Sequence, residues 1–327
     1  MKKIVLLSLI FLLPIYSYAV DQKIYFTQKK EVKLFITKMV KKYNFDKSYL
    51  EFLFSHAQLQ PKALEAYTQP IRAYKTDADW VKYTTKILTK DRVEAGKEFL
   101  KKYKTTLNRA EKIYKVPKEY IVGMIAIETY FGQFLGKLLV LDSLTTLAFI
   151  KNRKQKFFRY ELEQFIILIH KENLTPFSLR GSIAGAMGCS QQLPSVHLKY
   201  GVDFNKDGVK DLFDMEDCIG TLGNFLHQNG FTKDPIVAVQ TNFEGKNFNK
   251  LKTGYNKIYK LKYLKKRGIN PLTKFPYKKA SLLKLRYKDY QEIWLGNHNF
   301  QALTSYNHST NYAMAIHNFA KMLKSPL

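Results

Sequence analysis

The sequence Val116-Pro-Lys-Glu-Tyr-Ile-Val-Gly-Met-Ile-Ala-Ile-Glu128-Thr-Tyr-Phe-Gly132 predicts a helix around which the rest of the chain can be arranged. Its proline stands where a helix can begin, apolar residues follow, and its final glycine stands where the helix can end. At helical spacing Glu128 shares one face with Ile121, Met124 and Ile125. A carboxylate is therefore predicted on an apolar stripe.

This placement gives Glu128 a chemical use. Burial disfavours the charged form of a carboxyl and raises its pKa. A carboxylic acid that is still protonated near neutral pH is what a general acid requires. The alternative is a glutamate paired with one of the many lysines, so the helix alone does not identify a catalytic residue.

The composition is that of a globular and strongly basic protein. The chain has 327 residues, 46% of them hydrophobic, with 54 Lys+Arg against 27 Asp+Glu and a net charge of +27. This length allows one large domain or two smaller ones, and the hydrophobic content excludes wholesale disorder. A mean hydropathy of −0.30 excludes a protein with several membrane spans. The charge indicates an anionic partner: nucleic acid, a membrane surface or an acidic polymer.

The first residues predict export from the cytoplasm. A basic start is followed by an apolar run at 4–13 and by small residues up to Ala19, which is the pattern of a signal peptide cleaved after Ala19. The apolar run is shorter than the roughly 20 residues that a membrane anchor needs. Because no cysteine follows it, we expect no lipid anchor either. A periplasmic location disfavours nucleic acid as the partner and favours the cell wall.

Beyond the signal the chain is predicted to be mainly helical at first. Apolar residues recur at helical spacing in 31–43 and 91–114, and another helix is predicted to end near Gln228. A last helix begins near Asn311. Three short strands are predicted between these helices, at 235–241, 280–286 and 291–295.

The predicted strands lie in a segment that we call the basic lobe, residues 233–303. Within it, residues 246–288 contain 15 Lys+Arg and no Asp or Glu. Such a charge run is either a solvated face or a binding surface, and the sequence does not choose between them.

One loop fits the spacing of a calcium-binding EF-hand. The ligands at positions 1, 3, 5, 7 and 12 would be Asp203, Asn205, Asp207, the backbone carbonyl of Val209, and Asp214, with Gly208 at position 6. Aspartate at position 12, where glutamate is usual, favours weaker calcium binding or competition by Mg²⁺. The alternative is an ordinary polar turn. A single loop of this kind indicates structural bracing rather than calcium sensing.

Four segments, taken in order, resemble the signatures of lytic murein transglycosylases of the B type. They are 116–132, 180–195, 202–214 and 305–315. The resemblance implies a mainly α (α+β) fold. This fold has a lysozyme-like helical core, an additional helical region, a small antiparallel β lobe and one EF-hand-like loop.

The resemblance also implies an activity. Members of this family cleave the β-1,4 bond between N-acetylmuramic acid and N-acetylglucosamine without water, and the muramyl 6-hydroxyl forms a 1,6-anhydro end. Glu128 would be the single catalytic acid and base. Asp142, Glu161 and Glu163 remain available as a second carboxylate, which an ordinary glycosidase needs.

Other site residues carry over by position. Ser182 and Gln191 in a glycine-rich loop would hydrogen-bond the sugar. Asn307 would donate to its N-acetyl group or stabilise charge. The aromatic residues implied to line the cleft are Tyr83, Phe225, Tyr306 and Tyr312.

The sequence departs from the family pattern at two places. Cys189-Ser190 stands where an aromatic residue and glycine are frequent, and Phe225 stands where a tyrosine is expected, which removes one hydroxyl. Cys189 and Cys218 have no metal-ligand spacing. They could form a disulfide in the periplasm, but the sequence gives no distance between them and by itself favours separate thiols.

These observations define the expected organisation. We expect a signal peptide (1–19), an N-terminal helical region (20–115), a catalytic core (116–232), the basic lobe (233–303) and a C-terminal helix completing the cleft (304–327). The partner would be peptidoglycan glycan strands, bound by a monomer without an organic cofactor. The rival functions are a hydrolytic muramidase that uses Glu128 with water, and a cell-wall-binding scaffold without turnover.

Overall fold

The computed structural model describes residues 25–69, 80–244 and 247–325. The predicted signal peptide at 1–19 lies outside the described residues. Within the described part of the chain, no helix is both long and apolar enough to cross a lipid bilayer.

Helices make up most of the molecule, which confirms the predicted mainly α (α+β) class. They are η1 (Phe26–Gln28), α1 (Lys30–Tyr43), α2 (Lys47–His56), α3 (Pro61–Thr68), α4 (Trp80–Thr84), α5 (Lys90–Lys102), α6 (Lys104–Tyr114), α7 (Lys118–Thr129), α8 (Val140–Phe149), α9 (Gln155–Lys171), α10 (Pro194–Tyr200), α11 (Met215–Gln228), η2 (Asn247–Lys250), α12 (Leu261–Lys265), α13 (His298–Tyr306) and α14 (Thr310–Lys324).

Two small antiparallel sheets accompany the helices. A two-stranded sheet joins β1 (Leu138–Leu139) to β2 (Arg180–Gly181). A five-stranded sheet has the order β4-β6-β7-β3-β5. Its strands are β3 (Ala238–Phe243), β4 (Ile258–Lys260), β5 (Ile269–Pro271), β6 (Lys279–Arg286) and β7 (Gln291–Gly296).

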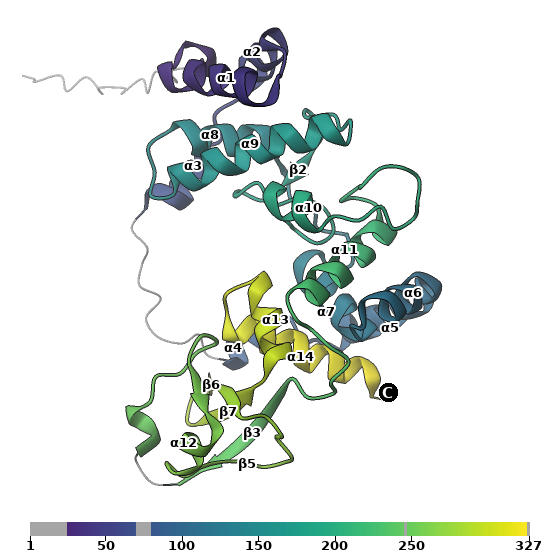
Figure 1. Ribbon diagram of the computed structural model, residues 1–327, viewed down its shortest axis with the longest axis vertical. Helices are drawn as coiled ribbons and strands as arrows, with labels where there is room; N and C mark the ends of the chain where they lie inside the picture. The colour runs from purple at the N-terminus through teal and green to yellow at the C-terminus, as the bar shows by residue number, and fades with distance from the viewer. Residues whose placement is uncertain (1–24, 70–79, 245–246, 326–327) are drawn as a thin grey trace, which may run out of the picture.

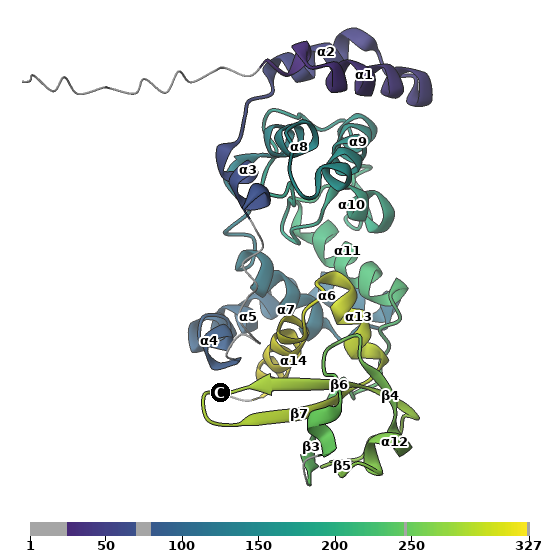
Figure 2. The same cartoon turned by 90° about the vertical axis from the view of Figure 1, so that its left-hand side faces the viewer.

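The molecule is elongated, with helices at one end and the five-stranded sheet at the other (Figures 1 and 2). Helices α1 and α2 lie at the far end, next to α8 and α9. Helices α7, α11, α13 and α14 lie between these and the sheet. The far helices share one hydrophobic core, and the central helices share another.

Helix α7 is the centre of the second core. Every residue from Tyr120 to Ala126 is buried, so the helix has no polar face along this part. It packs against α5, α11 and α14. A Cβ atom at Gly123 would lie 3.4 Å from the Ile316 side chain, which shows how closely α7 approaches α14.

Strand β6 connects the sheet to the helical body. Its apolar residues alternate between two cores: Leu282 faces the core of the basic lobe, and Leu283 and Leu285 belong to the core of α7 and α14. Because successive side chains of a strand point to opposite faces, a strand buried on both faces reads as a continuous apolar run. The basic lobe is therefore packed onto the helices through β6.

Two of the differences between the structure and the predicted elements have a plain physical reason. The expected helix at 91–114 is two helices, because the backbone at Tyr103 (φ −103°, ψ 26°) breaks the helical path. Strands β4 and β5 and the short helix α12 were not predicted. They lie in the lysine-rich segment, where three-residue strands give too little alternation to be recognised.

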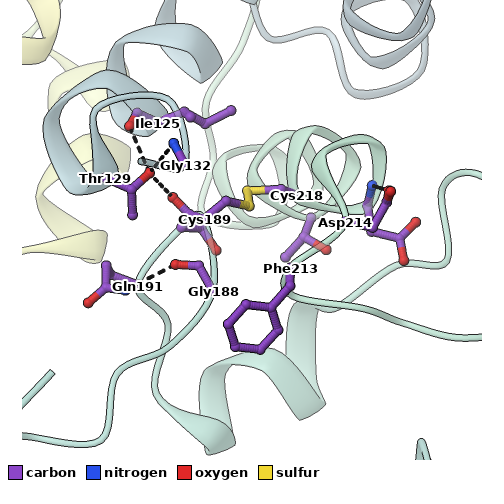
Figure 3. The surroundings of a disulfide bond; sticks show 12 residues. Ile125, Thr129, Gly132, Gly188, Cys189, Gln191, Phe213, Asp214 and Cys218 are labelled. Atoms are coloured by element: carbon purple, nitrogen blue, oxygen red, sulfur yellow. Dashed lines mark hydrogen bonds between the residues drawn. A yellow bond between two sulfur atoms is a disulfide. The ribbon is translucent and has the colours of Figure 1, made fainter. Parts of the chain in front are cut away.

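Cys189 and Cys218 form a disulfide bond, so the expectation of separate thiols was wrong. Figure 3 shows the bond between the glycine-rich loop and α11. The two residues are 29 positions apart in sequence, with Cα atoms 6.3 Å apart. The intervening chain folds back on α11, which no local sequence pattern predicts.

Removing this disulfide is expected to destabilise the fold. Closing a loop of 29 residues in the unfolded chain corresponds to about 3–4 kcal/mol in the chain-entropy estimate. The double substitution Cys189→Ala/Cys218→Ala should lower the free energy of unfolding in urea by roughly this amount relative to the oxidised protein. Reductant should destabilise the native chain and leave the double variant unchanged. Equal stability of the two proteins would contradict the prediction.

Candidate active site

Glu128 lies in the last turn of α7, where the helix stops abruptly. Tyr130, Phe131 and Gly132 all have positive φ angles (49°, 62° and 86°). Left-handed backbone is costly at two successive non-glycine residues and is found where surrounding contacts enforce it. The turn therefore holds Glu128 at a fixed end of the helix.

Thr129 fastens this helix end to the glycine-rich loop. Its buried hydroxyl donates to the carbonyl oxygen of Cys189 at 2.8 Å and accepts from the amide of Gly132 at 3.0 Å. Figure 3 shows both bonds beside the disulfide. At Gly188 (φ +74°) a Cβ atom would lie 2.4 Å from the Leu212 carbonyl oxygen, so only glycine fits there. The loop and the helix end consequently form one rigid unit.

The environment of the Glu128 carboxyl favours its protonated form. The side chain is partly exposed, yet burial among its neighbours raises its pKa to about 7. The hydroxyl of Tyr312 donates to Oε1 at 2.5 Å and opposes part of this rise, because it stabilises the carboxylate. At neutral pH the group can therefore both give and take a proton.

Three tyrosines surround this carboxyl. A negative charge on Glu128 raises the pKa of Tyr83, Tyr306 and Tyr312, which places all three in its vicinity; burial is the larger cause in each case. The rings of Tyr306 and Tyr312 are nearly parallel, with centroids 6.3 Å apart. The Tyr306 hydroxyl donates to the Ser190 carbonyl oxygen. All three side chains are neutral donors at physiological pH.

Phe225 and Tyr83 hold different positions relative to these rings. Phe225 is buried on α11 and meets Tyr306 edge-on, with centroids 5.0 Å apart. This contact helps to fix the position of the Tyr306 ring. Tyr83 is partly exposed on α4, stacked on the buried Trp80.

The polar residues of the predicted site differ in how many of their hydrogen-bonding groups already have a partner within the protein. Gln191 donates its amide nitrogen to the carbonyl oxygens of Leu135 and Gly188, both at 3.0 Å, so its carbonyl oxygen is the group left for a ligand. Ser182 Oγ accepts from the amides of Ala184 and Ala186 and can still donate. Asn307 is exposed, and its side-chain amide has no hydrogen bond within the described residues.

None of the three alternative carboxylates is bonded to Glu128 or shifts its pKa. Asp142 accepts from the Gln58 amide at 2.9 Å, and Glu161 accepts from the amide and hydroxyl of Ser195. Glu163 binds Lys38, Lys42 and Tyr43 of α1. Each of them joins structural elements elsewhere, and no described carboxylate is among the groups that shift the pKa of Glu128.

The predicted calcium loop lies between α10 and α11 and turns its oxygens inward. Asp203 accepts from the amides of Lys206, Asp207 and Gly208. Asp214 instead caps α11, since it accepts from the amides of Glu216 and Asp217. Among the described residues, no three Asp, Glu, His or Cys side chains gather as a metal-binding group.

Asp217 holds the backbone of this loop, a role that sequence reasoning missed. It is buried on α11 and accepts from the amides of Phe204, Asn205 and Asp211. Burial raises its pKa, and these three hydrogen bonds oppose the rise. In the sequence, the only signal of this role was the position of Asp217 in the first turn of α11, close to the N-cap residue Asp214. Thr129 was likewise missed, since its role depends on a loop 60 residues away.

Comparisons with known proteins agree on one family. Residues 27–321 match the model of the family described as the transglycosylase SLT domain. Membrane-bound lytic murein transglycosylase B of Escherichia coli K12 is 37% identical over 298 residues, which are 89% of this chain and 82% of that protein. The solved structure of E. coli lytic transglycosylase SLT35 in complex with calcium is 36% identical, with a TM-score of 0.84 over 90% of this chain and 93% of that chain. SltB1 of Pseudomonas aeruginosa is 32% identical, with a TM-score of 0.84 over 90% and 98% of the two chains.

Removing the Tyr312 hydroxyl should raise the pKa of Glu128 above about 7. The hydrogen bond stabilises the carboxylate, so its loss favours the protonated form, by about one to two pH units for a bond to a charged group. Carbon-13 NMR titration of the glutamate carboxyls in Tyr312→Phe measures this, with Glu128→Gln identifying the resonance. Tyr306→Phe is the matched control, since Tyr306 donates to Ser190 instead. An unchanged or lower pKa in Tyr312→Phe would contradict the assignment.

Proposed function

Because the chain belongs to the transglycosylase SLT-domain family of lytic murein transglycosylases, we propose that Glu128 is the single acid and base with which it cleaves peptidoglycan. The chain is a peptidoglycan-degrading enzyme of this family. The observation that carries the assignment of Glu128 is its carboxyl, with a pKa of about 7, at the end of a buried helix. No second carboxylate of the described residues is joined to it.

In the proposed reaction Glu128 first donates a proton and then accepts one. Protonated Glu128 gives its proton to the glycosidic oxygen between N-acetylmuramic acid and N-acetylglucosamine, and the bond from that oxygen to the anomeric carbon breaks. The muramyl 6-hydroxyl attacks the same carbon and returns its proton to Glu128. The product is a 1,6-anhydro end, no water is consumed, and the enzyme regains its starting state.

No described carboxylate contributes to the pKa of Glu128, which supports this route over hydrolysis. An inverting glycosidase needs a carboxylate that activates water, and a retaining one needs a carboxylate nucleophile. In this proposal the substrate supplies the nucleophile itself. Tyr312 keeps the carboxyl oriented through its hydrogen bond at 2.5 Å.

The neighbouring side chains are proposed to hold the sugar. The free amide of Asn307 and the hydroxyl of Ser182 suit the polar groups of N-acetyl sugars. The exposed face of the Tyr83 ring suits the apolar face of a sugar ring. Gln191 would accept through its carbonyl oxygen, since its amide nitrogen is already bonded.

We also propose that the enzyme works in the periplasm, after cleavage of the signal peptide at Ala19. The disulfide between Cys189 and Cys218 supports this proposal, because such bonds persist in oxidising compartments.

Product analysis tests the catalytic proposal. The mature protein should release muropeptides one water lighter than hydrolytic products from purified sacculi, as measured by mass spectrometry. Glu128→Gln should lower the rate at least about 100-fold, which is the usual range for a general acid or base. Reducing ends of full mass would make the enzyme a muramidase. Wall binding without any release in the native protein would make it a scaffold.

We propose in addition that the loop at 203–214 binds calcium. The E. coli relative SLT35 has been solved in complex with calcium. The donor set here consists of oxygens only, as hard cations prefer. Asp203, Asn205 and Asp207 would hold the ion with the Val209 carbonyl. Asp214 has one carboxylate oxygen that does not cap α11. Calcium would brace the loop and would take no part in the reaction.

Calcium should raise the melting temperature of the native protein and not that of Asp203→Asn/Asp207→Asn. A ligand at 100 times its dissociation constant stabilises the folded state by about 2.7 kcal/mol. Asp91→Asn is the control, because Asp91 is an exposed aspartate outside the loop. Thermal denaturation with calcium, with magnesium and with a chelator measures the effect. Equal melting temperatures in calcium and in chelator would show that the loop is an ordinary polar turn.

A further inference from the structure

The basic lobe contains a pocket of about 840 Å³ whose rim is formed by lysines. It lies between α12 and the segment that leads into β6. The lysines at this pocket are all exposed: Lys260, Lys262, Lys265, Lys266, Lys278 and Lys279.

These ammonium groups have no anionic partner in the described part of the chain. None of the six forms an ion pair there, although lysines elsewhere do, such as Lys101 with Glu98. Asp234, an acidic residue of the lobe, contacts the pocket residue Tyr277 and accepts a hydrogen bond from its hydroxyl. Like charges gathered around one pocket repel one another, and an anion bound there would relieve the repulsion.

The floor of the pocket is apolar. Leu261, Phe275 and Tyr277 contribute to it, together with the aliphatic stems of the lysines. A ligand that fits carries carboxylates toward the rim and methyl or methylene groups toward the floor. Short acidic peptides have this combination.

A second pocket of about 410 Å³ adjoins the first. It shares Tyr277, Lys278 and Lys279 with the lysine pocket and reaches Gln301 on α13. Helix α13 ends at Tyr306, the tyrosine whose pKa responds to Glu128. The Tyr255 ring of the lobe also stacks on His308, just beyond this helix. The two adjoining pockets therefore reach α13, the helix that also carries Tyr306.

We propose that the lysine pocket binds the carboxylates of the stem peptides attached to the glycan strand. This inference rests on the proposed function, because stem peptides reach the pocket only if a glycan strand lies at Glu128. The lysines surround a concave pocket, which suits a peptide segment better than the flat surface of a membrane. The lobe would select glycan that still carries acidic peptides.

Binding measurements without turnover test the proposal. Glu128→Gln serves as the background. Within it, Lys262→Gln/Lys265→Gln/Lys278→Gln/Lys279→Gln removes four charges from the pocket. Co-sedimentation is measured with intact sacculi, with sacculi whose carboxylates have been amidated by carbodiimide coupling, and with amidase-stripped glycan that lacks stem peptides.

The control variant removes the same number of charges from exposed lysines outside the lobe. It carries Lys41→Gln, Lys62→Gln, Lys151→Gln and Lys171→Gln, at positions with no ion pair among the described residues. Thermal denaturation of both variants checks that each is folded.

The pocket variant should bind intact sacculi about tenfold more weakly than the control, as expected for four exposed charge contacts, and raising the salt concentration should narrow the difference. The two variants should bind amidated sacculi and stripped glycan equally. The proposal would be overturned if the pocket variant lost as much binding to stripped glycan as to intact sacculi. It would also be overturned if the pocket variant and the control bound intact sacculi equally. Selective loss of binding to vesicles of phosphatidylglycerol, with sacculus binding unchanged, would overturn it in favour of a lipid surface.

The proposed function can fail independently of this test. Product masses from stripped glycan, measured with Glu128 intact, report on the chemistry alone. A hydrolytic product would change the reaction assigned to Glu128 and leave the binding result standing.

Discussion

The central constraint on the structure is one carboxyl group, Glu128, held at the end of an apolar helix inside a helical body. Burying an ionised carboxylate is costly, and the cost appears as a pKa raised from the usual value of 4.5 to about 7. A group with a raised pKa destabilises the fold as pH rises through that value, since the unfolded chain ionises more easily. The packing of α7 against α5, α11 and α14 must supply the stability that this requires. If Glu128 acts as proposed, the apolar length of α7 from Tyr120 to Ala126 serves the reaction as well as the core.

The position of this carboxyl is fixed by covalent and polar links between segments that are distant in sequence. Thr129 bonds the helix end to Cys189, Cys189 is bonded to Cys218 on α11, and Asp217 on α11 holds the backbone of the 203–214 loop. These links run in one chain from Glu128 to the predicted calcium loop, so bracing of that loop acts on the same unit. The glycine-rich loop needs little stability of its own, because it is held at both ends.

Regular local patterns made much of the fold predictable from the sequence. Helices α7, α11 and α14 follow from apolar spacing and from their stop signals, and Glu128 follows from its place on an apolar stripe. The disulfide, the role of Thr129 and the buried Asp217 were not predictable, because each depends on which distant segments meet. The engagement of the Gln191 amide by Leu135 and Gly188 is of the same kind. Residue type indicated a polar contact there, but only the fold shows which atoms remain free.

The raised pKa of Glu128 also restricts where positive charge can lie. A lysine beside Glu128 would stabilise the carboxylate and lower its pKa, and the group would lose its proton at neutral pH. The chain has 54 Lys+Arg. Nevertheless, among the described residues, only burial and the hydroxyl of one tyrosine shift the pKa of Glu128. Tyrosine is suited to this position, since it donates a hydrogen bond without adding charge. The longest stretch with lysines and no acidic residue lies instead in the basic lobe, which β6 attaches to the same core. In the proposed function, attraction for an anionic polymer and acid catalysis therefore take place in separate parts of the molecule.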